Sequence, residues 1–249
     1  MMRIAIIADV HGNLLALDAV LADVERRGGA GLLVNLGDCV SGPLWPAETA
    51  ARLMALDAVT VRGNHDRAVG TMRPEAMGPS DRHAVEALNP AQREWLAALP
   101  LRAQPVSGVL AFHATPAHDE TYLVEEVADG RLRRGPADAA AARLGDIGGN
   151  RVALCGHSHI AHLTRLGDGV LIVNPGSVGC PAYEDPSAPA HVSESGSPCA
   201  RYAVIDWAAG NEPSVAFHAI PYDHEAAARR AEANGRADWA RALRTGFMS

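Results

Sequence analysis

Several short apolar runs in this chain end directly in an aspartate, an asparagine or a histidine. The run at residues 3–8 is followed by Asp9, and the run at 57–62 is followed within two residues by Asn64. Continuous apolar runs of this length are typical of strands buried on both faces of a sheet that carries helices. Ligand sites in α/β proteins gather at the carboxyl ends of strands, so these polar residues are candidates for one common site.

The order of the elements predicts an α/β chain. Residues 3–8, 13–27 and 32–36 read as strand, helix and strand, which is the size of one βαβ unit. The same patterns predict helices at 46–55, within 80–99 and at 119–128, 136–145 and 223–244, and strands at 57–62, 105–113, 151–155, 162–166, 169–173, 201–207 and 214–220. A Gly-, Pro- and Ser-rich stretch at 174–199 predicts a long loop. Because early strands alternate with helices and later strands cluster, we expect a sandwich of mixed sheets with helices outside.

The bulk composition narrows the functional classes. The chain has 249 residues, 48% of them hydrophobic, and we expect one domain over residues 1–249 with a large core. A net charge of −7 makes nucleic acid an unfavoured partner, because non-specific binding to it needs clustered positive charge. An anionic substrate stays compatible with this charge, since bound metal ions can dominate the local field.

The cysteines and the N-terminus indicate a reduced, cytoplasmic protein. The four cysteines form no CxxC pair, which disfavours zinc-finger and redox motifs. Asp9 and His11 interrupt the first apolar run, and no small-residue cleavage site follows it, so it does not resemble a signal peptide. No apolar stretch reaches the roughly 20 residues of a membrane helix. We therefore expect no membrane association.

The polar residues at the predicted strand ends have the chemistry of a metal site. They are Asp9, His11, Asp38, Asn64, His113, His157 and His159. Mixed oxygen and imidazole donors suit Mn, Fe, Zn, Co or Ni. Seven ligands are too many for one tetrahedral zinc, but they match two metals that share a bridging carboxylate. In DVH and HSH the ligands are two residues apart, so on extended backbone they would share one face.

The specific signal is the ordered series of motifs, because a lone histidine is more often structural than a ligand. The histidines outside the series are expected on the surface or at a pocket rim; they are His83, His118, His162, His191, His218 and His224.

The series resembles the calcineurin-like metallophosphoesterases. The motifs that carry this resemblance are DVHGN (9–13), GDC (37–39), GNHD (63–66), FH (112–113), GHSH (156–159), NPGSVG (174–179) and IPYD (220–223). The chain looks most similar to the small prokaryotic phosphodiesterase branch. The resemblance implies a four-layer α/β sandwich, in which two mixed sheets are flanked by helices, and a dinuclear metal centre.

The resemblance also implies a role for each matching residue. One ion would be held by Asp9, His11 and His159, the other by Asn64, His113 and His157, and Asp38 would bridge them. The ions would be two divalent transition metals, with manganese favoured and iron, zinc, nickel or cobalt as alternatives. A water between them would attack phosphorus in line, while His65 would act on the leaving group. Asp66 is predicted to be either a loop-orienting or a functional residue.

One departure from the family pattern bears on the substrate. In the protein-phosphatase branch the second motif resembles GDxVDRG, with an aspartate that orients the catalytic histidine and an arginine that grips phosphate. Here Ser41 and Gly42 occupy those positions, so both groups are missing from this stretch. Candidate substrate-binding residues are Asn13, Arg67 and Tyr122.

We therefore expect hydrolysis of a phosphodiester of a small nucleotide-like or organic molecule. The alternatives are a phosphomonoesterase or phosphoprotein phosphatase at the same site and a non-catalytic scaffold like one subunit of the retromer coat. The presence of His65 together with all seven ligands argues against the scaffold. A nuclease is disfavoured, because no basic stripe or stacking platform is visible. The expected partner is a small phosphate ester, and a homo-oligomer is compatible with the sequence.

Overall fold

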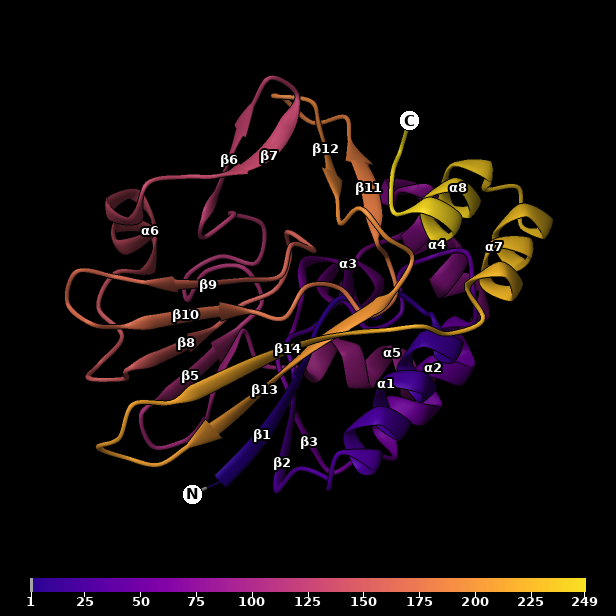
Figure 1. The fold of residues 1–249 in the computed structure, drawn as a ribbon. Coiled ribbons are helices and arrows are strands. Elements are labelled where there is room, and N and C mark those ends of the chain that lie inside the picture. The colour runs from indigo at the N-terminus through magenta and orange to yellow at the C-terminus, as the bar shows by residue number, and fades with distance from the viewer. Residues whose placement is uncertain (1) are drawn as a thin grey trace.

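The computed structural model describes residues 2–249, and two five-stranded sheets form its centre (Figure 1). The first sheet has the order β14-β13-β1-β2-β3, with the bounds β1 Met2–Ile7, β2 Leu32–Asn35, β3 Ala58–Thr60, β13 Ala200–Trp207 and β14 Ser214–Ile220. β1, β2 and β3 run parallel, whereas β13 pairs antiparallel with both β1 and β14. The carboxyl ends of the three parallel strands therefore meet at one edge of this sheet.

The second sheet has the same mixed character. Its order is β4-β5-β8-β10-β9, with the bounds β4 Arg102–Val106, β5 Val109–Phe112, β8 Val152–Leu154, β9 His162–Arg165 and β10 Leu171–Asn174. The three central strands β5, β8 and β10 are parallel, and both outer strands are antiparallel.

The alternation of side chains along each strand explains how the two sheets pack. In β1, Ile4 and Ile6 enter the core between the sheets, while Ala5 and Ile7 face a layer of helices. In the second sheet, Leu171 and Val173 face the shared core and Ile172 faces the opposite side. Apolar residues are thus needed on both faces, as expected for central strands covered on both sides.

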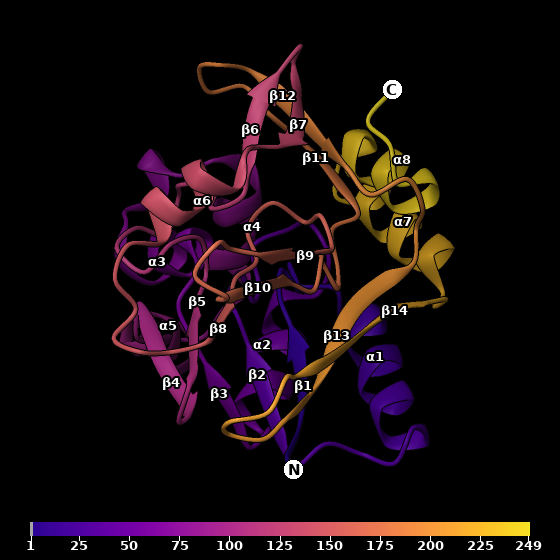
Figure 2. The ribbon, with the colours of Figure 1, turned by 60° about the vertical axis from the view of Figure 1, so that its left-hand side comes forward.

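Helices cover the outer face of each sheet. On the first sheet lie α1 (Leu14–Arg26), α2 (Pro46–Met54), α3 (Asn64–Thr71), α4 (Pro79–Ala87) and α5 (Pro90–Ala98), and the short 3₁₀ helix η1 (Pro74–Ala76) contacts α4. On the second lies α6 (Ala137–Leu144). This order of helix, sheet, sheet and helix confirms the predicted four-layer sandwich (Figure 2). Within residues 2–249 no helix is both long enough and apolar enough to cross a membrane.

A third sheet replaces two predicted elements. It has the order β11-β12-β7-β6, with the bounds β6 Glu125–Ala128, β7 Arg131–Arg134, β11 Ala182–Asp185 and β12 His191–Glu194. The predicted helix at 119–128 is therefore wrong, and the predicted loop at 174–199 contains two strands. Asp129 and Gly130 have φ values of +52° and +69°, which matches the Asp-Gly turn of a tight β-hairpin. That dipeptide was the signal in the sequence that should have favoured strands over a helix.

Three further boundaries differ from the sequence prediction. The strand expected at 105–113 is a hairpin of β4 and β5 that turns at Gly108, where φ is +86°. The helix expected at 223–244 is two helices, α7 (His224–Ala233) and α8 (Ala237–Thr245), because the chain turns at Gly235 with φ of +75°. No helix was predicted at the GNHD stretch, yet it begins the helix α3.

Asn13 joins three distant parts of the fold. It is fully buried at the start of α1, and its side-chain oxygen accepts a hydrogen bond from Ala16 N at 3.2 Å. Its amide nitrogen donates to the Gly179 carbonyl and to the Tyr222 hydroxyl, both at 3.0 Å. One side chain therefore caps a helix and fixes two later loops against it.

We expect Asn13→Ala to lower the free energy of unfolding by about 3 kcal/mol, because it removes a cap and leaves a buried carbonyl without its donor. Asn89 is a matched control, since it also caps a helix, α5, but is exposed and makes no such additional bonds. Asn89→Ala should cost only about 1 kcal/mol. Urea denaturation measures both values, and equal costs would contradict the joining role of Asn13.

Candidate metal centre

The strand ends bring the predicted ligands together in two groups. Asp9, His11 and His159 form one triad, and each offers a ligand atom within 4.8 Å of the others. Asp38, His113 and His157 form a second triad by the same measure. These residues follow β1, β2, β5 and β8, whose carboxyl ends point to one side of the sandwich.

Asp38 connects the two groups, and Asn64 joins the second one. The Asn64 Oδ1 atom lies 3.1 Å from His113 Nε2, so the amide faces the second triad. The Asp38 Oδ2 atom lies 3.3 Å from His113 Nε2 and 3.8 Å from His11 Nε2. One carboxylate oxygen thus borders both triads, and all seven predicted ligands belong to one continuous polar cluster.

The backbone of the candidate ligands is left-handed at most positions. Five of the six non-glycine residues with positive φ belong to the triads: Asp9, His11, Asp38, His157 and His159. The DVH and HSH motifs were expected on extended backbone, but both candidate ligands in each motif have a left-handed backbone. Side chains that adopt this strained conformation cluster at functional sites, where the surrounding structure holds them in place.

Three of the histidines are aligned by a backbone carbonyl behind the ring. His11 Nδ1 donates to the Ser41 carbonyl at 2.7 Å, and His113 Nδ1 donates to that of Leu36 at 2.8 Å. His159 Nδ1 donates in the same way to the Cys180 carbonyl at 2.7 Å. Because Nδ1 carries the hydrogen in each ring, Nε2 points into the site, as is common for histidines that bind metals.

Two features show that the site suits a cation. The Nε2 atoms of His11 and His159 lie 3.1 Å apart, a contact that is favourable only with a proton or a metal ion between them or beside them. The buried Asp9 Oδ1 atom makes no hydrogen bond of ordinary geometry, and its nearest partner is His159 Nε2 at 3.4 Å. A buried carboxylate next to facing imidazole nitrogens is costly unless a positive charge joins the group.

The pKa shifts of the site residues also favour a bound cation. Burial alone would raise the pKa of Asp38, but His113 and His65 hold it well below the ordinary value, so the carboxylate is anionic. Burial lowers the pKa of His11 to about 4, which leaves its Nε2 lone pair available at neutral pH. Burial would lower the pKa of His159 too, but Asp9 raises it well above the ordinary value. A metal ion bound there would replace that proton.

His65 has a partner that the sequence did not reveal. Its Nδ1 lies 2.7 Å from Asp81 Oδ1 on α4 and 3.3 Å from the Ser41 hydroxyl, while its backbone N–H donates to Asp38 Oδ1 at 3.0 Å. The orienting carboxylate that is missing from GDCVSGP is thus supplied by a different segment. No spacing rule links residues 65 and 81, because only the packing of α3 on α4 brings them together.

Asp66 fixes the loop that carries Asp38. Its carboxylate accepts hydrogen bonds from the backbone N–H groups of Asp38 at 2.8 Å, Cys39 at 2.9 Å and Gly63 at 2.9 Å. Asp66 is fully buried, so these bonds replace water around its carboxylate. This geometry favours the loop-orienting role among the two that the sequence left open.

Five of the seven predicted ligands line a cleft of about 900 Å³: His11, Asp38, Asn64, His157 and His159. Tyr122 lines this cleft and stacks on His157 with ring centroids 4.7 Å apart. The structure does not place the other two predicted substrate-binding residues in its lining. Asn13 is buried in the fold, and Arg67 makes a double ion pair with Asp119, at 2.9 and 3.2 Å, and another with Glu120. Arg67 therefore orders the loop before Tyr122 and is not a free anion contact.

His191, predicted at the surface or a pocket rim, is instead buried behind Tyr122. Its Nδ1 donates to the Pro189 carbonyl at 2.8 Å, so its Nε2 accepts from the Tyr122 hydroxyl at 2.9 Å. The Tyr183 hydroxyl then donates to Tyr122 at 2.8 Å. This chain of bonds fixes the ring that stacks on His157.

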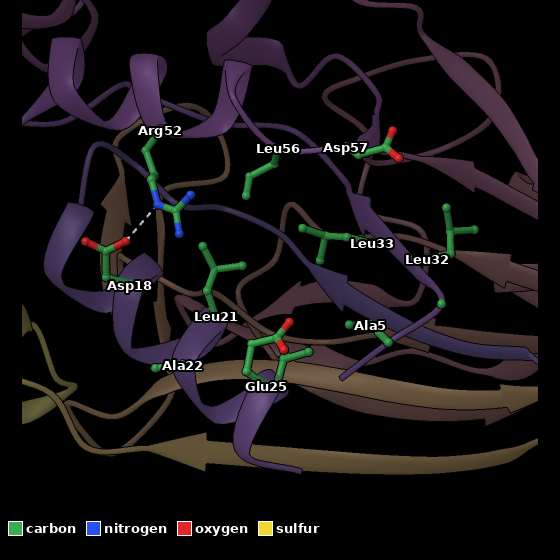
Figure 3. A pocket seen from close by; sticks show the side chains of 13 residues that line it. Ala5, Asp18, Leu21, Ala22, Glu25, Leu32, Leu33, Arg52, Leu56 and Asp57 are labelled. Carbon is green, nitrogen blue, oxygen red and sulfur yellow. Dashed lines mark hydrogen bonds and ion pairs between the residues drawn. The ribbon is translucent and has the colours of Figure 1, made fainter. Parts of the chain in front are cut away.

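A second hollow of about 490 Å³ lies away from the strand ends. It is formed by α1, α2 and β2, and Figure 3 shows Arg52 paired with Asp18 at its margin. None of the predicted site residues lines it, so the chemistry of the chain is concentrated in the larger cleft.

Comparisons with known proteins agree with this geometry. Residues 2–195 match the model of the calcineurin-like phosphoesterase superfamily domain. The chain is 29% identical over 204 residues to an uncharacterized protein from Methanocaldococcus jannaschii, covering 72% of this chain and 76% of that protein.

Two solved structures have a similar fold over almost their whole length. A metallophosphoesterase from Sphaerobacter thermophilus is 25% identical, with a TM-score of 0.74 and 99% of both chains covered. A hypothetical protein from Pyrococcus horikoshii OT3 is 19% identical, with a TM-score of 0.76 and 100% of both chains covered.

We expect His159→Ala to reduce the number of divalent ions bound per chain, because the Asp9 triad would lose one of its three side chains. Elemental analysis after loading with Mn²⁺ should fall from about two ions per chain to about one, if each ion needs at least three protein ligands. His218 lies in β14 and stacks on Tyr202, outside both triads, so His218→Ala is the control and should leave the count unchanged. An unchanged count in His159→Ala would refute the assignment of that triad.

Proposed function

Because the chain belongs to the calcineurin-like phosphoesterase superfamily, we propose that it hydrolyses phosphodiesters of small organic or nucleotide-like alcohols. The proposal assigns one divalent cation to Asp9, His11 and His159 and a second to Asn64, His113 and His157, with Asp38 between them. The observation that carries it is the position of Asp38 Oδ2 within 3.3 and 3.8 Å of one imidazole from each triad. A carboxylate shared in this way is the arrangement that two neighbouring cations require.

The protein contributes positioning and proton transfer. Two divalent cations, when bound, would offset the charge on the phosphate and lower the pKa of a water that attacks phosphorus. The side chains that line the cleft would hold the ester next to this water. His65 lines the same cleft, and about a third of its side chain is exposed.

His65 is placed to act as the general acid. Burial alone would lower its pKa, but Asp38 and Asp81 raise it above the ordinary value, so the ring carries a proton at neutral pH. With Nδ1 held by Asp81, Nε2 is free to donate to the oxygen of the departing alcohol. Asp81 is then a positioning residue that fixes the direction of this donor.

The charge of the cleft favours diesters over monoesters. Besides Asp38, the lining contains the carboxylates of Asp81, Glu120, Glu184, Asp185 and Asp238, and its only guanidinium is that of Arg236. Arg236 is already bound to Asp238 through two hydrogen bonds. Asp81 and Glu120 are likewise paired, with His65 and Arg67, which leaves Glu184 and Asp185 as the repulsive groups. At neutral pH a monoester is close to a dianion whereas a diester carries one negative charge, so the diester meets less repulsion from these two carboxylates.

We expect the purified protein with Mn²⁺ to hydrolyse bis-p-nitrophenyl phosphate faster than p-nitrophenyl phosphate, because the acidic cleft disfavours the dianion. Release of p-nitrophenolate at saturating metal measures both rates, and a metal-free sample is the control. A higher kcat/KM for the monoester would replace the proposal with a phosphomonoesterase at the same site. Absence of turnover with either ester would favour a non-catalytic role.

We expect His65→Ala to lower kcat by roughly 10²- to 10³-fold, within the range of a lost general acid. Asp81→Asn should lower kcat by about tenfold with little change in KM, because it loosens His65 without removing it. Ser41→Ala is the comparison, since its hydroxyl makes only the longer 3.3 Å contact, and its effect should be smaller.

Steady-state kinetics of the double variant separates positioning from a second catalytic role. If Asp81 acts through His65, adding Asp81→Asn to His65→Ala lowers kcat no further. A full additional loss in the double variant would contradict that relation.

A further inference from the structure

One wall of the cleft comes from the C-terminal helices. α8 and the residues around it supply Arg236, Asp238, Trp239 and Met248 to the cleft lining. The adjoining wall comes from the strand β11 of the third sheet, which packs against α8, and Figure 2 shows β11 and α8 on the same side of the molecule. The family model ends at residue 195, so α8 is a part of this chain that the shared family pattern does not describe.

Two aromatic rings border the first triad from these two walls. The Trp239 ring lies edge to face with His11, with centroids 5.9 Å apart. The Tyr183 ring lies edge to face with His159, with centroids 4.7 Å apart. His11 and His159 are themselves in contact, so a phosphate held at this triad has an aromatic side chain on either side.

The space between these walls suits an uncharged group. The Arg236 guanidinium donates to both oxygens of Asp238, at 3.0 and 2.7 Å, and to the Ser80 hydroxyl at 2.9 Å, so three of its five N–H donors are used and its charge is paired with Asp238. Glu184 and Asp185 on the other wall would repel a second anionic group. The rest of the lining there includes the apolar side chains Ala182, Pro186 and Met248.

We propose that Trp239 and Tyr183 form a subsite for a flat, uncharged aromatic group, of the nucleobase type, on the alcohol that stays attached to phosphorus. The inference rests on the proposed phosphodiesterase function and specifies its substrate. The departing oxygen must face His65, which Asp81 holds, so this proposal assigns the retained alcohol to the remaining part of the cleft, beside Trp239 and Tyr183. Stacking on an aromatic side chain stabilises any base, because every base has a flat π face.

Trp45 provides a matched control for Trp239. Both tryptophans pack on the small core of α7 and α8, and an arginine lies over each ring, at 5.9 Å for Trp45 and 5.8 Å for Trp239. Only Trp239 lines the cleft. If Trp239 served solely to anchor α8, substitution of either residue would have the same consequence.

The test uses three diesters that share p-nitrophenol as the leaving group and carry thymidine 5′-, phenyl or methyl as the retained group. The measured quantity is kcat/KM for each aromatic ester divided by kcat/KM for the methyl ester, in Mn²⁺, for the full chain. We expect the wild type to favour the thymidine ester and Trp239→Leu to reduce that ratio by about tenfold, in the range of one lost stacking contact. Trp239→Phe should retain most of the ratio, and Trp45→Leu should leave it unchanged. Thermal unfolding of each variant shows whether it is folded.

The phenyl ester distinguishes a nucleobase from any flat ring. If Trp239→Leu lowers the ratio only for the thymidine ester, the subsite is assigned to the base. An unchanged thymidine ratio in Trp239→Leu, or an equal fall in Trp45→Leu, would overturn the subsite. If the wild type cleaves none of the three esters, the proposed function fails separately. Quenching of tryptophan fluorescence by thymidine 5′-monophosphate then decides the subsite: quenching that is lost in Trp239→Phe supports it, and quenching that persists overturns it.

Discussion

The direction of three imidazole rings depends on a hydrogen bond that each makes away from the cleft. His11, His113 and His159 each give Nδ1–H to a main-chain carbonyl, and those carbonyls belong to Ser41, Leu36 and Cys180. Each carbonyl is part of a segment that follows a strand, so the two sheets set the orientation of the rings through the backbone. The polar cluster is thus a product of sheet geometry, and side-chain packing contributes less to it than the positions of the strand ends.

The candidate ligands are held in position by hydrogen bonds and ring contacts from residues behind them. Asp38 is anionic next to several histidines, and the loop that carries it is held by three backbone N–H bonds to Asp66. Tyr122 and His191 form a similar support behind His157. Groups behind the candidate ligands matter because a ring or carboxylate that turns away loses its partner in a site with little water.

Much of the fold could be predicted, because a short, continuously apolar run has few alternatives to a strand that is buried on both faces of a sheet. β1, α1 and β2 agree with the predicted strand, helix and strand to within one or two residues. The third sheet was not predicted, since its strands are short and polar, as in the run Arg131–Arg134, and are stabilised by their neighbours rather than by burial. The turn at Gly235 that separates α7 from α8 was missed for a similar reason, because the residues on both sides favour a helix.

In the site, too, positions set by a single strand could be predicted, whereas contacts between distant segments could not. The residues that converge could be predicted because each follows its own strand, whereas Asp81 could not, since its contact with His65 depends on how two helices pack. Likewise the sequence, which made Arg67 a candidate substrate contact, does not show that Asp119 and Glu120 bind its guanidinium.

Gly37 and Gly63 meet where β2 and β3 end, and a Cβ atom on Gly37 would collide with the backbone of Gly63. Likewise a Cβ atom on Gly63 would collide with Asp38 Oδ1. The two backbone segments are therefore in direct contact beside Asp38, and no flexible side chain lies between them. This contact fixes the spacing between the Asp38 loop and the segment that carries Asn64, so these two candidate ligands can change their distance only by turning their side chains.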